Sequence, residues 1–208
     1  CPTVILIPGL GLFAAGNSSN SAKVAADLGE VNAQVISDAE EIGTFECISE
    51  KDIFEIEHWS LEQAKLSKSR EKPLQRQVVV ITGGAGSIGA ATAKAFADEG
   101  AEVVILDKSI SNALKISKSI NCTAIKCDVT EEKSIKSALS ETCELFGGVD
   151  ILVSNAGVAS EGEIGNVSSK FLRESFEINF WSHQSVCQSV LKIMLKQKTG
   201  GCLLFNTS

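Results

Sequence analysis

Residues 77–89 read QVVVITGGAGSIG, a run of β-branched apolar residues followed at once by a glycine-rich turn. The apolar run predicts a buried strand, and the residues from Ser87 to Glu99 have the pattern of a helix. Glycines 84, 86 and 89 fit G-x-G-x-x-G within this strand-turn-helix setting. Glycine is required because a β-carbon would block the approach of a diphosphate, which the helix N-terminus attracts. The stretch therefore predicts a dinucleotide-binding turn formed by Gly83, Gly84, Gly86, Ser87 and Ile88.

An acidic residue at the end of the next predicted strand supports this interpretation. Asp107 stands 18 residues after Gly89, close to the separation at which a carboxylate binds both hydroxyls of an adenosine ribose. The same carboxylate repels a 2′-phosphate, so the sequence favours NAD over NADP, although the adjacent Lys108 offsets part of that repulsion. The alternative is a glycine-rich turn followed by an ordinary surface aspartate.

Strands and helices alternate along the chain after Pro73. Five short apolar runs predict strands, at 77–81, 102–106, 123–127, 151–153 and 202–205. Four segments between them predict helices, at 87–99, 111–119, 131–146 and 169–198, with Gly100 ending the first and Thr130 beginning the third. This alternation predicts an α/β fold, a Rossmann-like doubly wound parallel sheet that is covered on both faces and incomplete at its C-terminus.

A change of character near Lys72 divides the chain into two expected domains, residues 1–72 and 73–208. In the first, we expect a strand at 3–7, a glycine- and serine-rich turn at 8–21, a helix around the apolar residues at 24, 28, 31 and 35, and a second helix at 60–69. The basic stretch 65–72 is interpreted as a solvated connector. Residues 9–14, GLGLFA, fit G-x-G-x-x-A, but no acidic residue closes a second strand at the proper distance, so no second nucleotide site is predicted.

Composition and charge exclude several classes of function. The 208 residues carry 26 acidic and 19 basic side chains, a formal net charge of -7, which argues against a nucleic-acid partner. The chain has neither a long uninterrupted apolar stretch nor a basic segment before an apolar one, so no membrane span or signal peptide is expected. Seven cysteines, an odd number without a CxxC pair, suit a reducing compartment, and we expect a cytoplasmic protein.

Four further features make residues 76–208 resemble the short-chain dehydrogenase/reductase family. Asp128 and Val129 close the third strand, Asn155-Ala156-Gly157 follow the fourth, Asn179 lies within the long helix, and Ser208 follows the fifth strand. The resemblance implies that Asp128 contacts the adenine and that the Asn-Ala-Gly motif steadies the sheet beside the cofactor. It also implies that Asn179 and Ser208 are catalytic. Asparagine in the middle of a helix is unfavourable unless its side chain has a partner.

The glycine-rich turn departs from the family's usual spelling. That spelling is T-G-x-x-x-G-x-G, and here Ser87 stands at the position of its penultimate glycine. Read as T-G-x-x-G-x-x-G from Thr82, the turn resembles the extended, epimerase-like branch, whereas the Asn-Ala-Gly motif favours the ordinary branch. An epimerase-like sugar enzyme therefore stays an alternative.

The first 75 residues resemble part of a second family. Residues 8–13, the segment 54–66 and the pair Pro73-Leu74 look like the junction in bifunctional class II aldolase/short-chain dehydrogenases of the rhamnulose-1-phosphate aldolase/lactaldehyde dehydrogenase type. The resemblance implies that the chain is an internal fragment, with the C-terminal tail of an aldolase-like α/β domain in front and the aldolase's metal-binding histidines upstream. His58 and His183 stand alone, without a partner at ligand spacing, so no metal site is predicted.

The family transfers a hydride between a nicotinamide ring and a carbinol carbon, and a tyrosine and a lysine in Tyr-x-x-x-Lys exchange the proton. This chain contains no tyrosine, and the motif would follow Ser208. The resemblance thus implies that the full-length parent is a homo-oligomeric, NAD-dependent oxidoreductase for a small hydroxy-aldehyde, alcohol or sugar. It also implies that these 208 residues alone are inactive. The alternative is a non-catalytic NAD-binding or scaffolding protein.

Overall fold

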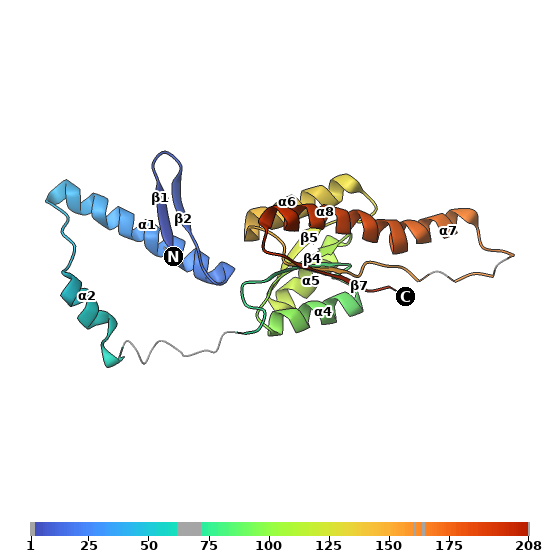
Figure 1. Cartoon of the computed structure of the whole chain (residues 1–208), viewed down its shortest axis with the longest axis horizontal. Coiled ribbons are helices and arrows are strands. Elements are labelled where there is room, and N and C mark those ends of the chain that lie inside the picture. Colours follow the sequence, from blue (N-terminus) through green and yellow to red (C-terminus); the bar gives the residue numbers. More distant parts are fainter. Residues whose placement is uncertain (1–2, 62–71, 160, 164, 208) are drawn as a thin grey trace. The chain divides into compact units, whose positions relative to one another are not determined.

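The chain forms two compact units, Cys1–Glu71 and Lys72–Ser208 (Figure 1). The computed structural model describes residues 3–61, 72–159, 161–163 and 165–207. Every buried apolar side chain among these residues belongs to the second unit, which therefore contains the hydrophobic core.

The second unit contains a five-stranded parallel sheet with the strand order β5-β4-β3-β6-β7. Its strands are β3 (Val78–Thr82), β4 (Glu102–Asp107), β5 (Thr123–Lys126), β6 (Ile151–Ser154) and β7 (Cys202–Phe205). The chain starts at the centre with β3, moves outward to β5, and then crosses to the other side at β6. The prediction of a doubly wound parallel sheet is confirmed. The reversal of strand order between β3 and β6 leaves a crevice at the carboxyl ends of the strands, where such sheets bind ligands.

Helices cover both faces of this sheet (Figure 1). α4 (Ser87–Asp98) and α5 (Ile110–Ile120) pack on one face, and α6 (Glu132–Phe146) and α8 (Ser182–Gln197) pack on the other. Side chains along β3 alternate between the two cores, with Val79 and Ile81 towards α4 and α5 and Val80 towards α6 and α8. Burial on both faces explains why the strands are continuous apolar runs in the sequence.

The helix predicted over 169–198 is present, but its pitch changes in the middle. It comprises α7 (Ser169–Phe176), the π-helical turn η1 (Glu177–Trp181) and α8. In this turn the Ser182 N–H donates to the Glu177 carbonyl, five residues back. A π turn inserts a residue into the helical repeat and is frequent at functional sites.

Most of the predicted strands and helices have a boundary that is wrong by one residue. The third helix begins after Glu131 rather than at Thr130, because the Thr130 hydroxyl donates to the Asp128 carboxylate at 2.7 Å instead of capping the helix. The strand expected over 123–127 ends at Lys126.

The first unit begins with an antiparallel hairpin. β1 (Val4–Ile7) pairs with β2 (Gly11–Ala14), and α1 (Ser19–Ile42) and α2 (Glu50–Glu57) follow. The helix predicted around residues 24–35 is confirmed as part of α1, which begins with reciprocal hydrogen bonds between Ser18 and Ser21. The turn predicted over 8–21 is wrong in part, because it contains β2. Residues 9–14 therefore lie in a strand-turn-strand arrangement, which lacks the helix that a dinucleotide turn requires.

Other predictions for the first unit fall partly outside the described residues. Of the helix expected over 60–69, only Ser60 and Leu61 are described, and both are helical. The connector expected over 65–72 lies almost entirely outside them. α2 lies before this segment, where no helix was expected. Among the described residues no helix has both the length and the apolar character needed to cross a bilayer, and their six cysteines are all free thiols.

Candidate functional site

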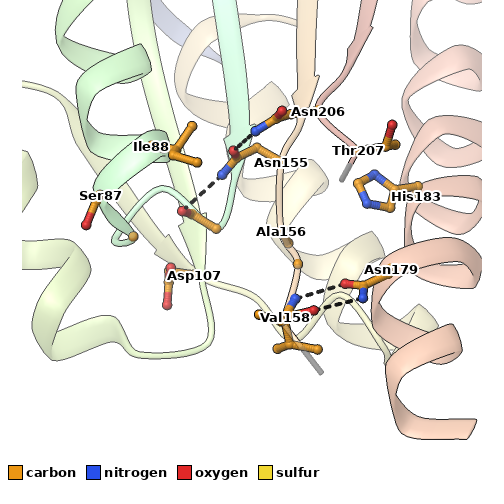
Figure 2. A pocket seen from close by; sticks show the side chains of 15 residues that line it. Ser87, Ile88, Asp107, Asn155, Ala156, Val158, Asn179, His183, Asn206 and Thr207 are labelled. Carbon is orange, nitrogen blue, oxygen red and sulfur yellow. Dashed lines mark hydrogen bonds between the residues drawn. The ribbon is translucent and has the colours of Figure 1, made fainter. Parts of the chain in front are cut away.

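The carboxyl ends of β3, β6 and β7 border a pocket of about 550 Å³ in the second unit (Figure 2). The turn between β3 and α4 and the end of β4 form one side of it, and η1, α8 and the residues after β7 form the other. The pocket thus lies at the crevice where the strand order reverses. Its fifteen lining residues are Gly83, Gly86, Ser87, Ile88, Gly89, Asp107, Asn155, Ala156, Gly157, Val158, Ala159, Asn179, His183, Asn206 and Thr207.

The turn between β3 and α4 needs glycine for two different reasons. A β-carbon on Gly84 would lie 2.5 Å from Cβ of Ile105, so Gly84 packs behind the turn and does not line the pocket. A β-carbon on Gly89 would collide with the carbonyl oxygen of Gly83. A β-carbon on Gly86, in contrast, would meet nothing closer than that same oxygen at 3.4 Å. Gly86 therefore faces open space, where a ligand can approach the main chain.

The N-terminus of α4 points into this space. Gly86 is the N-cap residue, and no side chain caps the helix. The first N–H groups of an α-helix have no acceptor within the helix, and they carry the positive end of its dipole. Ser87 and Ile88 begin this helix on the pocket side. The arrangement offers several uncapped main-chain donors to an anion, such as a diphosphate.

Asp107 lies beside the same turn, at the end of β4. Its Oδ2 accepts from the Ala85 N–H at 3.0 Å, and its Oδ1 accepts from the Ser109 N–H at 2.8 Å. These bonds fix the carboxylate, and each oxygen keeps a further lone pair for a ligand. A hydroxyl-bearing group next to the N-terminus of α4 would therefore meet a fixed, negatively charged acceptor.

Asn155 joins the ends of three strands. Its main-chain N–H and that of Ala156 donate to the Thr82 hydroxyl at 2.9 and 3.0 Å. The Asn155 side chain donates to the Thr82 carbonyl at 3.1 Å. It also accepts from the Asn206 side chain at 2.8 Å (Figure 2). Gly83 can pass close to Ala156 because it has no β-carbon, which would lie 2.9 Å from the Ala156 Cα, and its φ of +64° also favours glycine. Asn155 thus ties β3, β6 and the segment after β7 together beside the glycine-rich turn.

Asn179 lies in the π turn, and its side chain holds a loop. Its Oδ1 accepts from the Val158 N–H at 2.8 Å, and its Nδ2 donates to the Val158 carbonyl at 2.9 Å (Figure 2). Nδ2 also donates to the Ser175 hydroxyl at 3.3 Å. A β-carbon on Gly157 would lie 3.2 Å from Oδ1 of Asn179, so the loop passes close to the helix. These partners explain why asparagine stands in the middle of a helix.

Sequence analysis did not identify three polar residues on this side of the pocket, His183, Asn206 and Thr207. His183 follows Asn179 by one helical turn, and its Nδ1 lies 2.7 Å from the hydroxyl of the buried Ser154. Burial lowers the pKa of His183. The spacing of four residues from Asn179 is a signal that the two side chains share a helix face. The other two residues directly follow a parallel strand, at the edge of the sheet where ligands bind.

Asp128 and Val129, which we expected near an adenine, are not among the described residues that line the pocket. Asp128 instead accepts from the Lys108 ammonium at 2.7 Å and from the Thr130 hydroxyl and N–H. Burial acts to raise the pKa of Asp128, but the hydrogen bonds from Lys108 and Thr130 outweigh it, and the pKa is lowered. Lys108 is therefore bound by Asp128. Ser208, the second expected catalytic residue, lies outside the described residues.

Comparison with known proteins places both units. The sequence model of the short chain dehydrogenase family matches residues 77–207, and that of the class II aldolase second domain matches residues 1–66. The uncharacterized oxidoreductase YuxG of Bacillus subtilis is 35% identical over 212 residues, which cover 98% of this chain and 31% of that protein. Galactitol 2-dehydrogenase of Agrobacterium fabrum is 34% identical over 133 residues, covering 63% of this chain and 52% of that enzyme. The solved structure of gox2181 has a TM-score of 0.60 and 32% identity, covering 62% of this chain and 52% of that one.

The sheet order, the glycine-rich turn and the pocket define a nucleotide-binding α/β domain. With the family match over residues 77–207, the chain belongs to the short-chain dehydrogenase family. It joins this domain to part of a class II aldolase module, so the predicted aldolase–dehydrogenase combination is confirmed. The chain spans about half the length, or less, of these relatives.

The family uses a nicotinamide cofactor, and the residues of the pocket fit one. The uncapped N-terminus of α4 and the open space at Gly86 suit the diphosphate of a dinucleotide. The carboxylate of Asp107 suits a ribose, and the pocket extends from there to Asn179 and His183 for the second nucleoside.

Proposed function

We propose that the second unit is the cofactor-binding part of an NAD-dependent oxidoreductase, which transfers hydride between the nicotinamide and a small hydroxy-aldehyde, alcohol or sugar. The position of Asp107 carries this proposal. Its carboxylate lies beside the glycine-rich turn, where it accepts from the Ala85 N–H at 3.0 Å. A carboxylate at this place binds both hydroxyls of an adenosine ribose and repels the 2′-phosphate of NADP. Lys108 does little to offset the repulsion while Asp128 binds its ammonium.

The chain's own groups have different roles along the pocket. The N-terminus of α4 and Gly86 hold the diphosphate, and Asn155 keeps the turn in register with β6. Asn179 holds Val158 and the start of the following loop beside the reacting end, which makes it a positioning residue through its side chain. Ser208 is proposed to hydrogen-bond the substrate oxygen. The nicotinamide supplies the hydride acceptor or donor when it is bound.

Small alcohols and sugars are proposed as substrates because galactitol 2-dehydrogenase, a relative of the second unit, is named for a polyol. The similarity to YuxG runs along 98% of this chain, and it includes the aldolase-like residues. Together these matches support a longer protein of the rhamnulose-1-phosphate aldolase/lactaldehyde dehydrogenase type. The match to the short chain dehydrogenase model supports this function over an epimerase-like enzyme.

Titration of the chain with NAD and NADP tests the cofactor assignment. In the variant Asp107→Asn, one acceptor oxygen remains for the Ser109 N–H but the charge is lost. We expect the wild-type chain to bind NAD at least about tenfold more tightly than NADP, and the variant to lose about 1–2 kcal/mol of NAD binding and with it the preference. Asp98→Asn, at an exposed position of α4, is the matched control and should leave both affinities unchanged.

Two outcomes would contradict the proposal in different ways. Tighter binding of NADP than of NAD by the wild-type chain contradicts the role of Asp107. Binding of neither dinucleotide contradicts the function as a whole. A hydride-transfer assay with small polyols on the full-length protein separates the enzyme from a non-catalytic NAD-binding protein.

A further inference from the structure

A buried polar pair closes the side of the pocket away from β4. Nδ1 of His183 lies 2.7 Å from the hydroxyl oxygen of Ser154, and the two residues are 7% and 2% exposed. The pair joins α8 to β6, and the ring of Phe205 on β7 lies 6.3 Å from the imidazole, centre to centre. His183 also lines the pocket, on the same side as Asn179 (Figure 2). The proposed function does not use this pair.

Burial, rather than a neighbouring charge, determines the protonation state of His183. On α8 the thiol of Cys187 stands one turn further on, and burial raises its pKa, so it is neutral at pH 7. Asp150 precedes β6 at the opposite end of that strand, where it accepts from the main chain of β3 at 2.8 Å. Glu177 begins η1 and is exposed, and β7 contributes the apolar ring of Phe205. Burial is the cause that lowers the pKa of His183 below 6.5, so its imidazole is neutral at pH 7.

We propose that His183 makes the pocket discriminate between the oxidised and reduced forms of a nicotinamide nucleotide, through the charge of its imidazole ring. The inference rests on the proposed function, which places the diphosphate at α4 and the adenosine at Asp107. The second nucleoside must then extend towards Asn179 and His183. The oxidised nicotinamide ring carries a positive charge, whereas the reduced ring carries none. A neutral imidazole allows either form to bind, whereas a positively charged imidazolium repels the positively charged oxidised ring.

The sign of the resulting pH dependence can be worked out. At pH 8 His183 is neutral, and its charge does not affect either nucleotide. As the pH falls through the lowered pKa of His183 the imidazole gains a proton, and the affinity for NAD⁺ falls relative to that for NADH. Attraction of the imidazolium to the diphosphate acts on both nucleotides equally and cancels in the ratio. Two like charges in a partly buried pocket weaken binding by about tenfold when the imidazole is fully protonated.

Calorimetric titration with NAD⁺ and with NADH at pH 8 and pH 5.5 measures this ratio of dissociation constants. For the wild-type chain we expect the ratio of the NAD⁺ value to the NADH value to be higher at the lower pH, with a limit of about tenfold when the imidazole is fully protonated. His183→Asn keeps a nitrogen near the position of Nδ1 but cannot be protonated, so its ratio should stay constant. His58→Asn changes the only other histidine, which lies in the first unit, and should behave as the wild type does.

A second measurement needs no variant. By linkage, the pKa of His183 must be lower in the NAD⁺ complex than in the NADH complex, by up to about one unit. NMR titration of the imidazole C2–H follows this pKa in each complex. Equal pKa values in the two complexes, or a pH dependence that persists in His183→Asn, overturn the inference while cofactor binding stands. Binding of neither nucleotide by the wild-type chain overturns the proposed function together with this inference.

Discussion

Two glycines of the same turn are required for different reasons, Gly86 for ligand binding and Gly84 for folding. Gly86 has φ −77° and an added methyl group would meet open space, so Gly86→Ala should change the free energy of unfolding by less than about 1 kcal/mol. The methyl group would block the diphosphate, and we expect the affinity for NAD to fall at least about tenfold. NAD titration and thermal denaturation measure the two effects.

Gly84→Ala is the control for this prediction. Its β-carbon would lie 2.5 Å from Cβ of Ile105, and overpacking of this kind costs about 1–3 kcal/mol of stability. Gly86→Ala should therefore lose affinity for NAD with little loss of stability, whereas Gly84→Ala should lose stability. Wild-type affinity for NAD in Gly86→Ala would mean that the diphosphate lies elsewhere.

The ion pair of Lys108 and Asp128 predicts a pH effect at a single residue. The pKa of Asp128 is lowered although burial acts to raise it, because Lys108 and Thr130 donate to its carboxylate. A lowered carboxyl pKa contributes stability that is present above the pKa of the unfolded chain and is lost as the pH falls through the folded value. In Lys108→Met the pKa of Asp128 should rise, and the stability difference from the wild type should vanish in acid.

Carboxyl-detected NMR of the side chain follows the pKa of Asp128 directly. Lys94→Met breaks a pair of similar length, that of Lys94 with Asp98 on α4 at 2.7 Å, and serves as the control. It should leave the pKa of Asp128 unchanged. If the pKa of Asp128 is unchanged in Lys108→Met, the hydrogen bonds from Thr130 alone are responsible for the lowering.

At the scale of elements, the π turn and the loop after β6 are connected by one side chain. Asn179 pairs with both main-chain groups of Val158, at 2.8 and 2.9 Å. Asn179→Leu removes both bonds, so hydrogen exchange of the Val158 amide should accelerate by about tenfold or more. Ser175→Ala removes only the 3.3 Å bond to Asn179 and should accelerate it less. Unchanged protection in Asn179→Leu would show that the loop is held by other contacts.

The sequence predicts the elements of the second unit well and those of the first unit less well, for a physical reason. β3 and β4 are buried on both faces, so each is a continuous apolar run that stands out in the sequence. β2 is four residues long and largely exposed, and it leaves no comparable pattern. The π turn has no apolar pattern of its own, because it continues the helices on either side.

Residues of the pocket could be predicted from the sequence where they belong to a motif or lie at the end of a strand. Gly86, Asp107 and Asn155 were identified in this way, and all three line the pocket. His183 was not, because a single histidine on a helix carries no mark of what it packs against. Only the fold brings it to Ser154, which lies 29 residues earlier in the chain. The pairing of Asp128 with Lys108 likewise depends on two adjacent strands.

At the scale of the whole molecule, the two units differ in how much they bury. None of the residues described between 3 and 61 is buried, and α1 exposes Val24, Leu28, Val31 and Val35. The second unit buries apolar side chains on both faces of its sheet. Because hydrophobic burial is the dominant favourable term in folding, residues 72–208 alone should unfold cooperatively, whereas residues 1–71 alone should show no cooperative transition.

Every residue that lines the pocket belongs to the second unit, so the isolated segment 72–208 should also keep its ligand. We expect its affinity for NAD to stay within about twofold of that of the full chain, and its Tm to stay within about 2 °C. Circular dichroism melting curves and NAD titration of the full chain and of both segments measure this. A cooperative melt of residues 1–71, or lost NAD binding by residues 72–208, would contradict the prediction, because either result requires stabilising interactions that burial within each unit does not account for.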